Sequence, residues 1–437
     1  MRKYFGTDGI RGRVGEFPIT PDFAMKLGYT VGKILARTNK SPSVLIGKDT
    51  RISGYLFESS LEAGFSYAGV NVYMAGPIPT PAVAYLTRAL RLSAGVVISA
   101  SHNSYIDNGI KFFSENGSKF PDSFELQIEK ELDSEMQKAD ELGKVIRLED
   151  ARGRYIEFCK SNFSQMLDLK NLKIVLDCAN GATYQVAPNI LRELGAQVIS
   201  IGVSPDGVNI NYECGSTHPE SLIKAVIQHN ADLGIAFDGD GDRVLFVDKN
   251  GQIYDGDKLL YVIVKAYLAS GKKVDGVVGT VMTNLGFANA LSNMGINLIR
   301  SKVGDRYVLE ELIKNGWILG GETSGHILCL DKHTTGDGII SALQVLSAII
   351  ILGKPLHELI DWQGYPQVML NIKLANKDMD WHTLSRNAID DAVKNLGESG
   401  RVIVRASGTE PLVRVMVEAK DVSIAKSWAQ KIAETIK

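Results

Sequence analysis

An internal repeat limits the folds open to this chain of 437 residues. Apolar strands alternate with helices, and a polar, glycine-rich loop follows the third strand of each of three copies. The third strands are predicted at Ala94–Ser99, Leu233–Phe237 and Trp317–Leu319. Short β-branched runs between helical segments are typical of βαβαβ units. We therefore expect three similar α/β domains with mainly parallel or mixed sheets.

The pattern changes after Ile360, where a smaller C-terminal α+β domain is predicted from alternating and helical periodicities. Its strands are expected at Gln367–Leu374, Arg401–Arg405 and Val413–Ala419, and its helices at Trp381–Leu396 and Val422–Ile436. The charged stretch Glu129–Asp150 is predicted to be a surface helix with a linker. We place the four domains at residues 1–150, 151–252, 253–364 and 365–437.

The balance of charges argues against two classes of partner. The chain has 48 Lys and Arg residues and 50 Asp and Glu residues, so its formal net charge is −2. Such a chain has no bulk attraction for nucleic acid or an anionic membrane. Its most apolar run, Ile339–Leu352, is too short to span a membrane and is predicted to be a buried helix. Four scattered cysteines favour free thiols, and without a signal-peptide pattern we expect a cytoplasmic protein.

The loop after the third strand of the second copy carries alternating acids, Asp238-Gly-Asp240-Gly-Asp242-Arg243. Residues two apart on an extended chain point to the same side, so the three carboxylates can converge. Oxygen ligands suit Mg²⁺ or Ca²⁺, whereas an EF-hand is excluded because Arg243 stands where it needs glycine. The alternative is a solvated acidic turn. Ligands bind beyond the carboxyl ends of parallel strands, so the three loops would face one cleft if the three units pack side by side.

The first and third loops carry hydroxyl and imidazole groups. Ser99–Asn103 contains Ser101 beside His102 but no nucleophile elbow, which leaves a plain polar turn or a serine that carries a phosphoryl group. Glu322–His326 offers a carboxylate, a hydroxyl and an imidazole that suit sugar hydroxyls, although the pattern alone is also that of an ordinary loop.

Three further segments suit charged ligands. Arg405–Pro411 with Arg414 combines guanidinium groups, hydroxyls and a glycine turn that favour phosphate, or else forms a plain strand turn. Arg11 lies in a glycine-rich loop at Phe5–Gly12. Lys111 is a candidate for proton transfer, against the alternative of a solvated lysine; as a general base it would need a lowered pKa, which a cationic cleft favours.

Together these segments resemble the α-D-phosphohexomutase superfamily over essentially the whole chain. The motifs that carry the resemblance are FGTDGIRG at Phe5–Gly12, ISASHN at Ile98–Asn103, DNGIKFF at Asp107–Phe113, DCANGATY at Asp177–Tyr184, AFDGDGDR at Ala236–Arg243, VGDRYV at Val303–Val308, GGETSGH at Gly320–His326 and RASGTEP at Arg405–Pro411. The resemblance implies three α/β domains and a fourth domain similar to the TATA-binding protein.

The resemblance also implies roles for individual residues. Ser101 would be phosphorylated, and its phosphate would bind one Mg²⁺ together with Asp238, Asp240 and Asp242. Acid/base or charge-stabilising groups at the reacting phosphate would be Arg11, His102, Lys111, Arg243 and His326. Substrate contacts would come from Arg243, Gly304, Asp305, Glu322 and Ser324. The non-reacting phosphate would be held by Arg405, Ser407, Gly408, Thr409 and Arg414.

The reaction implied by the resemblance interconverts glucosamine 6-phosphate and glucosamine 1-phosphate through a phosphoserine and a 1,6-bisphosphate. A hexosamine 1,6-bisphosphate would prime the enzyme, whose product would supply UDP-N-acetylglucosamine for cell-envelope synthesis. The expected partner is a small phosphosugar, and the expected assembly is a monomer or homodimer. The alternatives are a mutase for mannose or glucose phosphates, a Mg²⁺-dependent phosphatase, and a sensor that binds without conversion.

Overall fold

The computed structural model describes residues 2–374, 379–406 and 412–436. Contacts between residues divide the chain into two compact units. The first comprises Met1–Thr280 and Ile299–Leu359, and the second comprises Val281–Leu298 and Ile360–Lys437.

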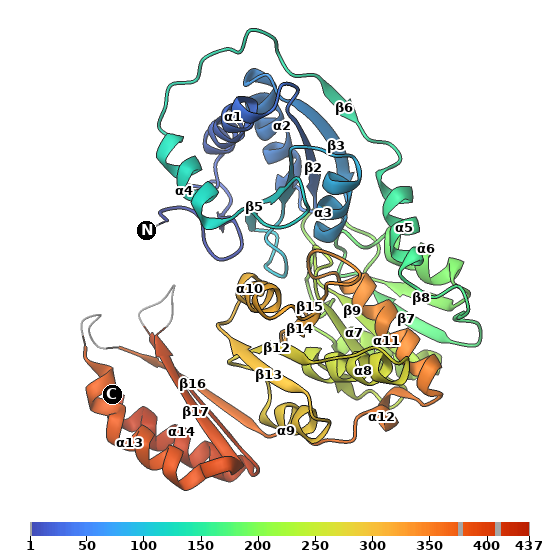
Figure 1. Ribbon diagram of the computed structural model, residues 1–437, viewed down its shortest axis with the longest axis vertical. Helices are drawn as coiled ribbons and strands as arrows, with labels where there is room; N and C mark the ends of the chain where they lie inside the picture. The colour runs from blue at the N-terminus through green and yellow to red at the C-terminus, as the bar shows by residue number, and fades with distance from the viewer. Residues whose placement is uncertain (1, 375–378, 407–411, 437) are drawn as a thin grey trace. The chain divides into compact units, whose positions relative to one another are not determined.

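The first unit begins with a six-stranded mixed sheet, some of whose strands are labelled in Figure 1. In spatial order its strands are β1 (Ile10–Arg13), β5 (Asp107–Ser114), β4 (Ala94–Ile98), β2 (Ser43–Lys48), β3 (Asn71–Pro77) and β6 (Val145–Arg147). The strands from β4 to β6 are parallel, whereas β5 is antiparallel to both β4 and β1. The accompanying helices are α1 (Pro21–Thr38), α2 (Ser53–Tyr67), α3 (Thr80–Ala89) and α4 (Asp122–Glu131).

Two more mixed sheets follow. The second has the order β11 (Ile253–Tyr254), β10 (Val244–Asp248), β9 (Leu233–Phe237), β7 (Lys173–Asp177) and β8 (Gln197–Ile201). The third has the order β13 (Asn297–Ser301), β12 (Gly276–Thr280), β14 (Leu319–Gly321) and β15 (Ile327–Cys329). The helices along this part of the chain are α5 (Ala151–Ser161), α6 (Val186–Glu193), α7 (Glu220–His229), α8 (Gly256–Ala269), α10 (Asp305–Asn315), α11 (Gly338–Leu352) and α12 (Leu356–Leu359). Helix α9 (Leu285–Asn293) belongs to the second unit.

Each expected loop is the turn of a hairpin. The third strands β4, β9 and β14 are followed by antiparallel partners β5, β10 and β15. These partner strands were not predicted, since their apolar runs directly follow the polar loops. Both ends of each loop are consequently fixed to the same sheet.

Two segments differ from expectation. The helix predicted within Glu129–Asp150 is instead α4, which ends at Glu131, and the chain later adds β6 to the sheet edge. The side chains of residues 133–150 are mostly exposed, so no apolar stripe holds a helix there, while Val145 and Ile146 suit a strand. The third strand of the last repeat is Leu319–Gly321 rather than Trp317–Leu319.

The apolar run near residue 340 forms the buried helix α11, as predicted. Asp337 caps its first turn by accepting the N–H groups of Ile339 and Ile340, and Gly353 ends it in a left-handed conformation. Within the described ranges no helix is both long and apolar enough to cross a membrane. The cysteines are buried free thiols, also as predicted: Cys159, Cys178, Cys214 and Cys329.

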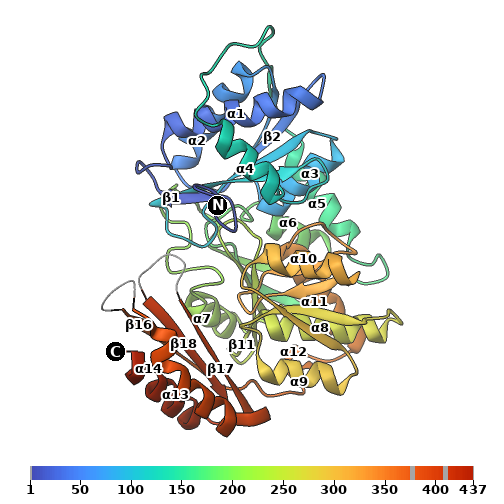
Figure 2. The same ribbon diagram turned by 60° about the vertical axis from the view of Figure 1, so that its left-hand side comes forward.

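The second unit holds an antiparallel sheet in the order β16 (Gln367–Lys373), β18 (Leu412–Ala419) and β17 (Gly400–Ala406). Helices α13 (Trp381–Leu396) and α14 (Val422–Ile436) lie side by side on one face, as Figure 2 shows. Apolar side chains of both layers, including Trp381, Val415 and Ile432, form its core. These elements match the sequence-based expectation to within one residue at either end.

Candidate active site

Ser101 lies in the turn between β4 and β5, with almost its whole side chain buried. Its Oγ donates to Asp238 Oδ2 at 2.7 Å and lies 3.4 Å from His102 Nδ1. The backbone of Ser101 has φ +53°, a left-handed conformation that few serines adopt. The first loop therefore presents its hydroxyl directly to the acidic loop of the second repeat.

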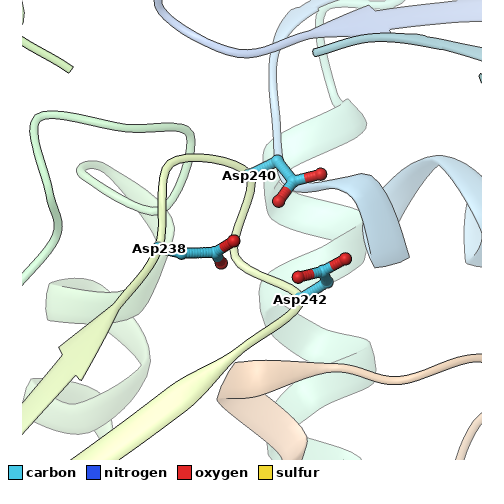
Figure 3. Close-up of side chains that lie close together, drawn as sticks. All are labelled: Asp238, Asp240 and Asp242. Atoms are coloured by element: carbon cyan, nitrogen blue, oxygen red, sulfur yellow. The ribbon is translucent and has the colours of Figure 1, made fainter. Parts of the chain in front are cut away.

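The three aspartates of the second loop are buried and close together. Their carboxylate oxygens lie within 4.8 Å of one another, and Figure 3 shows Asp238, Asp240 and Asp242 gathered on one turn. Burial and the two neighbouring carboxylates raise the pKa of Asp238 well above its usual value. Oδ1 of Asp240 and of Asp242 finds no hydrogen-bond partner among the described residues. These oxygen donors, buried and partly unpartnered, fit a hard divalent cation such as Mg²⁺.

Lys111 extends from β5 into this cluster. Its Nζ donates to Asp240 Oδ2 at 2.8 Å and lies 3.0 Å from Asp8 Oδ2. Burial alone would lower the pKa of Lys111, but the carboxylates of Asp240 and Asp8 raise it above its usual value. The expectation of a lowered pKa is therefore wrong for this arrangement, because the cleft surrounds the ammonium group with carboxylates rather than with cations.

Asp8 and Lys119 belong to the same network but were not predicted. Asp8 pairs with Arg11, and Lys119 bridges Asp8 to Asp305, whose Oδ2 lies 2.5 Å from Nζ. Burial would raise the pKa of Asp8, but Lys111, Lys119 and Arg11 hold it well below its usual value. The sequence offered a weak reason to expect Asp8 in the site, because it stands three residues before Arg11. No motif contains Lys119.

The third loop meets the second through His326. Its Nδ1 lies 3.5 Å from Asp242 Oδ2 and its Nε2 lies 3.6 Å from Asp305 Oδ2. Burial lowers the pKa of His326, but these carboxylates and Glu322 raise it to about 9. Glu322 also accepts the Gly304 N–H at 2.9 Å, which joins two segments predicted to contact substrate. Ser324, in the same loop, is exposed.

A cavity of about 360 Å³ opens beside these groups. Its lining residues are Tyr4, Gly6, Thr7, Asp8, Gly9, Arg11, Asp242, Arg243, Val303, Gly304, Asp305, Glu322 and His326. The N-terminal loop and segments of the second and third repeats line it. Ser101 and His102 of the first loop do not line the cavity, but Ser101 Oγ donates to Asp238 of the second loop, and Asp242 of that loop lies beside His326 of the third. The three loops therefore contact one another through the acidic turn within the first unit. Carboxylates, cations and backbone N–H groups together suit a polar, anionic ligand.

The predicted phosphate-binding residues lie in the second unit. Arg405 on β17 is the direct cross-strand partner of Arg414 on β18, so two guanidinium groups flank one hairpin. Ser407, Gly408 and Thr409 lie outside the described residues.

Four family models match the chain in order. They describe the phosphoglucomutase/phosphomannomutase alpha/beta/alpha domain I at residues 2–139, domain II at 153–251, domain III at 255–365 and the C-terminal domain at 369–435. A curated relative, the phosphoglucosamine mutase of Neisseria meningitidis serogroup B, is 58% identical over 440 residues. The match covers 100% of this chain and 99% of the relative.

Two solved structures share the fold. A phosphoglucomutase/phosphomannomutase family protein from Burkholderia thailandensis matches with a TM-score of 0.83 at 23% identity, covering 100% of this chain and 98% of that chain. The N-acetylphosphoglucosamine mutase of Aspergillus fumigatus, in complex with GlcNAc-6P and magnesium, matches with a TM-score of 0.70 at 16% identity, covering 100% and 96%. The predicted fold class, three α/β domains and a C-terminal α+β domain, is confirmed.

Proposed function

The chain belongs to the phosphoglucosamine mutase family of the phosphohexomutases, and we propose that it interconverts glucosamine 6-phosphate and glucosamine 1-phosphate. The observation that carries the proposal is the Ser101 hydroxyl, 2.7 Å from Asp238 and turned into a buried cluster of three carboxylates. A binding site alone has no use for a buried nucleophile at this position. Full-length identity to phosphoglucosamine mutases favours the amino sugar among hexose phosphates.

The reaction begins with Ser101 phosphorylated, a state that a hexosamine 1,6-bisphosphate would establish. The bond between phosphorus and Ser101 Oγ breaks as a bond to the free sugar hydroxyl forms, and the hydroxyl proton ends on Ser101 Oγ. The resulting 1,6-bisphosphate turns within the cleft, and its other phosphoryl group returns to Ser101. Three side chains are candidates for carrying the proton between the oxygens: His102, whose Nδ1 lies 3.4 Å from Ser101 Oγ, His326 and Lys111. The raised pKa of Lys111 suits it to hold a proton as an acid rather than to accept one as a base.

Charge at the cleft suits phosphoryl transfer. A phosphoserine brings about −1.5 to −2 charges, so it needs cations beside three carboxylates. Asp238, Asp240 and Asp242, together with phosphate oxygens on Ser101, would hold one Mg²⁺, whose positive charge stabilises the transferring group when bound. Arg11 and Arg243 add guanidinium groups at the cavity wall.

Two sets of residues would recognise the substrate in this proposal. Gly304, Asp305 and Glu322 line the cavity and, together with Ser324 from the same loop as Glu322, would contact sugar hydroxyls. The non-reacting phosphate would be held by Arg405, Ser407, Gly408, Thr409 and Arg414. The likeness to an enzyme solved with GlcNAc-6P and magnesium supports a phosphosugar ligand and this metal. A cytoplasmic location and a monomeric or homodimeric state stay predictions.

Phosphorus NMR of the purified protein tests the proposal directly. With Mg²⁺ and a catalytic amount of glucose 1,6-bisphosphate, glucosamine 6-phosphate should yield a 1-phosphate signal faster than glucose or mannose 6-phosphate does. Faster conversion of either competitor would show that another hexose phosphate is the preferred substrate. Release of inorganic phosphate alone would indicate a phosphatase, and binding without conversion would indicate a sensor.

Ser101→Ala is the decisive variant. We expect turnover to fall by a factor on the order of 10³ or more, because no other group can hold the phosphoryl in transit. Circular dichroism should show an intact fold, since the hydroxyl makes one side-chain bond of consequence, to Asp238. Near-normal turnover in this variant would rule out the phosphoserine mechanism.

A further inference from the structure

Two side chains outside the cavity lining hold the Ser101 turn by its backbone. Arg51 Nη2 donates to the carbonyl oxygens of Ser101 at 3.2 Å and Asn103 at 2.7 Å. Asn211 Nδ2 donates to the same two oxygens at 2.9 and 3.0 Å. Each carbonyl thus accepts one N–H from the first repeat and one from the second.

Arg51 is fully buried and is itself fixed by its neighbours. Its Nη1 lies 3.4 Å from Asp49 Oδ2, and its backbone N–H donates to Asp49 Oδ1 at 3.0 Å. Asp49 Oδ2 accepts the Ser99 hydroxyl at 2.6 Å, and Ser99 Oγ accepts the Ser101 N–H at 2.9 Å. Arg51 is therefore linked to Ser101 at two points. Its guanidinium group binds the Ser101 carbonyl oxygen, and its neighbours Asp49 and Ser99 connect it to the Ser101 N–H. A buried guanidinium needs such partners.

Asn211 reaches this turn from the loop before α7. Its own backbone is left-handed, with φ +57°, and its N–H donates to Ala179 O at 2.9 Å. Gly239, between the first two aspartates, packs against the same atoms: a Cβ there would lie 2.6 Å from Ser101 O and 2.7 Å from Asn211 Nδ2. The acidic turn and the serine turn therefore meet at one carbonyl oxygen, and only glycine permits that approach.

We propose that Arg51 and Asn211 are positioning residues that hold Ser101 in its left-handed conformation, with Oγ directed at Asp238. A serine keeps this unfavourable backbone only where its surroundings over-determine it, and four hydrogen bonds to two carbonyls supply that restraint. Neither side chain contacts Oγ or lines the cavity. Their loss should therefore lower kcat and leave KM nearly unchanged. The inference rests on the proposed phosphoserine function.

The test uses Asn211→Asp and Asn211→Ala. The first keeps the shape but replaces the donating amide with a carboxylate that faces two carbonyls, and the second removes the group. We expect kcat to fall about 10- to 100-fold, as for a displacement of about 1 Å at a reacting atom, with KM within about twofold. Phosphorylation of Ser101 by glucose 1,6-bisphosphate, followed by mass spectrometry, should slow in proportion.

Gln344→Ala is the matched control, because Gln344 is also a buried amide that donates to a backbone carbonyl, that of Asn162 at 3.1 Å. It should lower the melting temperature without lowering kcat. Arg51→Lys, which keeps the charge, should lose less kcat than Arg51→Met. Unchanged kcat in both Asn211 variants, or a raised KM with unchanged kcat, would overturn the inference. An inactive wild-type protein would instead refute the proposed function, while the phosphorylation rate still tests the positioning role.

Discussion

Two histidines of the cleft show how neighbouring charge sets protonation. Burial, Arg243 and Arg11 lower the pKa of His102 to about 4. His326, although also buried, has a pKa raised to about 9 because carboxylates surround it. At neutral pH one imidazole is neutral and the other is charged. Both histidines were predicted as site residues from the sequence. The difference between their pKa values was not predicted, since the charges that decide it come from other loops.

A third histidine, His333, makes the free energy of unfolding depend on pH. Its Nε2–H donates to Pro81 O at 3.0 Å and its Nδ1 accepts the Thr334 N–H at 2.7 Å, so the neutral ring uses both nitrogens. Burial lowers its pKa from 6.5 to about 4. As the pH is lowered, His333 is protonated in the unfolded chain before it is protonated in the folded chain. The free energy of unfolding therefore falls as the pH drops from about 6.5 to about 4. The whole shift corresponds to about 3 kcal/mol.

Urea unfolding of the wild type and His333→Gln at pH 7 and pH 4.5 measures this contribution. The wild type should lose more free energy of unfolding between the two conditions than the variant does. Asp337, 4.0 Å from the ring, has a pKa raised to about 6 by burial and acts in the opposite direction. Since both proteins contain Asp337, comparing them isolates the histidine. Equal losses would show that the ring is not held neutral.

Helices and strands were largely predictable where apolar periodicity is strong. Helices α13 and α14 occupy the predicted residues, and α11 begins one residue before its predicted start. The antiparallel strand β10 was missed because it follows an acidic turn without any helix between. Helix α1 was missed as well, because its packing against α2 depends on contacts that the repeat pattern does not contain.

The approach of α1 to α2 depends on Gly64. A Cβ at Gly64 would lie 2.1 Å from Met25 O, a backbone atom of α1 that cannot yield alone. We expect Gly64→Ala to lower the free energy of unfolding by about 1–3 kcal/mol through overpacking, with kcat unchanged. Gly153→Ala in α5 is the control, because nothing lies within 4 Å of its added Cβ. It should be neutral or stabilising by at most about 1 kcal/mol. Equal effects in thermal melts would contradict this packing argument.

The acidic turn contacts the serine turn through Asp238 and the third loop through Asp242, so the ion proposed on this turn would also stabilise the first unit. Without a cation, the carboxylates around Asp238 repel one another, as the raised pKa of Asp238 indicates. We expect Mg²⁺ to raise the melting temperature, by an amount equivalent to about 2.7 kcal/mol at a hundred times its Kd. Asp238→Asn should melt higher than the wild type in chelator but gain less from Mg²⁺. Equal gains in both proteins would place the cation elsewhere.

The least predictable features of the cleft are its long-range partners. Ser101 and the three aspartates stand in recognisable motifs, so the sequence located them. Lys119 meets Asp305 across 186 positions, and Asn211 meets Ser101 across 110. Such pairs form only when the repeats pack against one another. This packing produces no recognisable sequence pattern in either segment. Asn211 carries a faint local sign, since asparagine tolerates a left-handed backbone.

The hairpin form of the three loops has a consequence for how members of this family diverge. Each loop leaves and re-enters a single sheet, so a change at its tip leaves the two flanking strands in place. In the proposed enzyme the nucleophile and the metal ligands stand on two turns that contact each other, whereas most of the sugar recognition stands on a third turn. Grafting the turn between β14 and β15 from a relative with another hexose should change sugar preference while the serine and acid turns keep their chemistry. Substrate choice can therefore change through one turn, provided that His326 and its contact with Asp242 are kept.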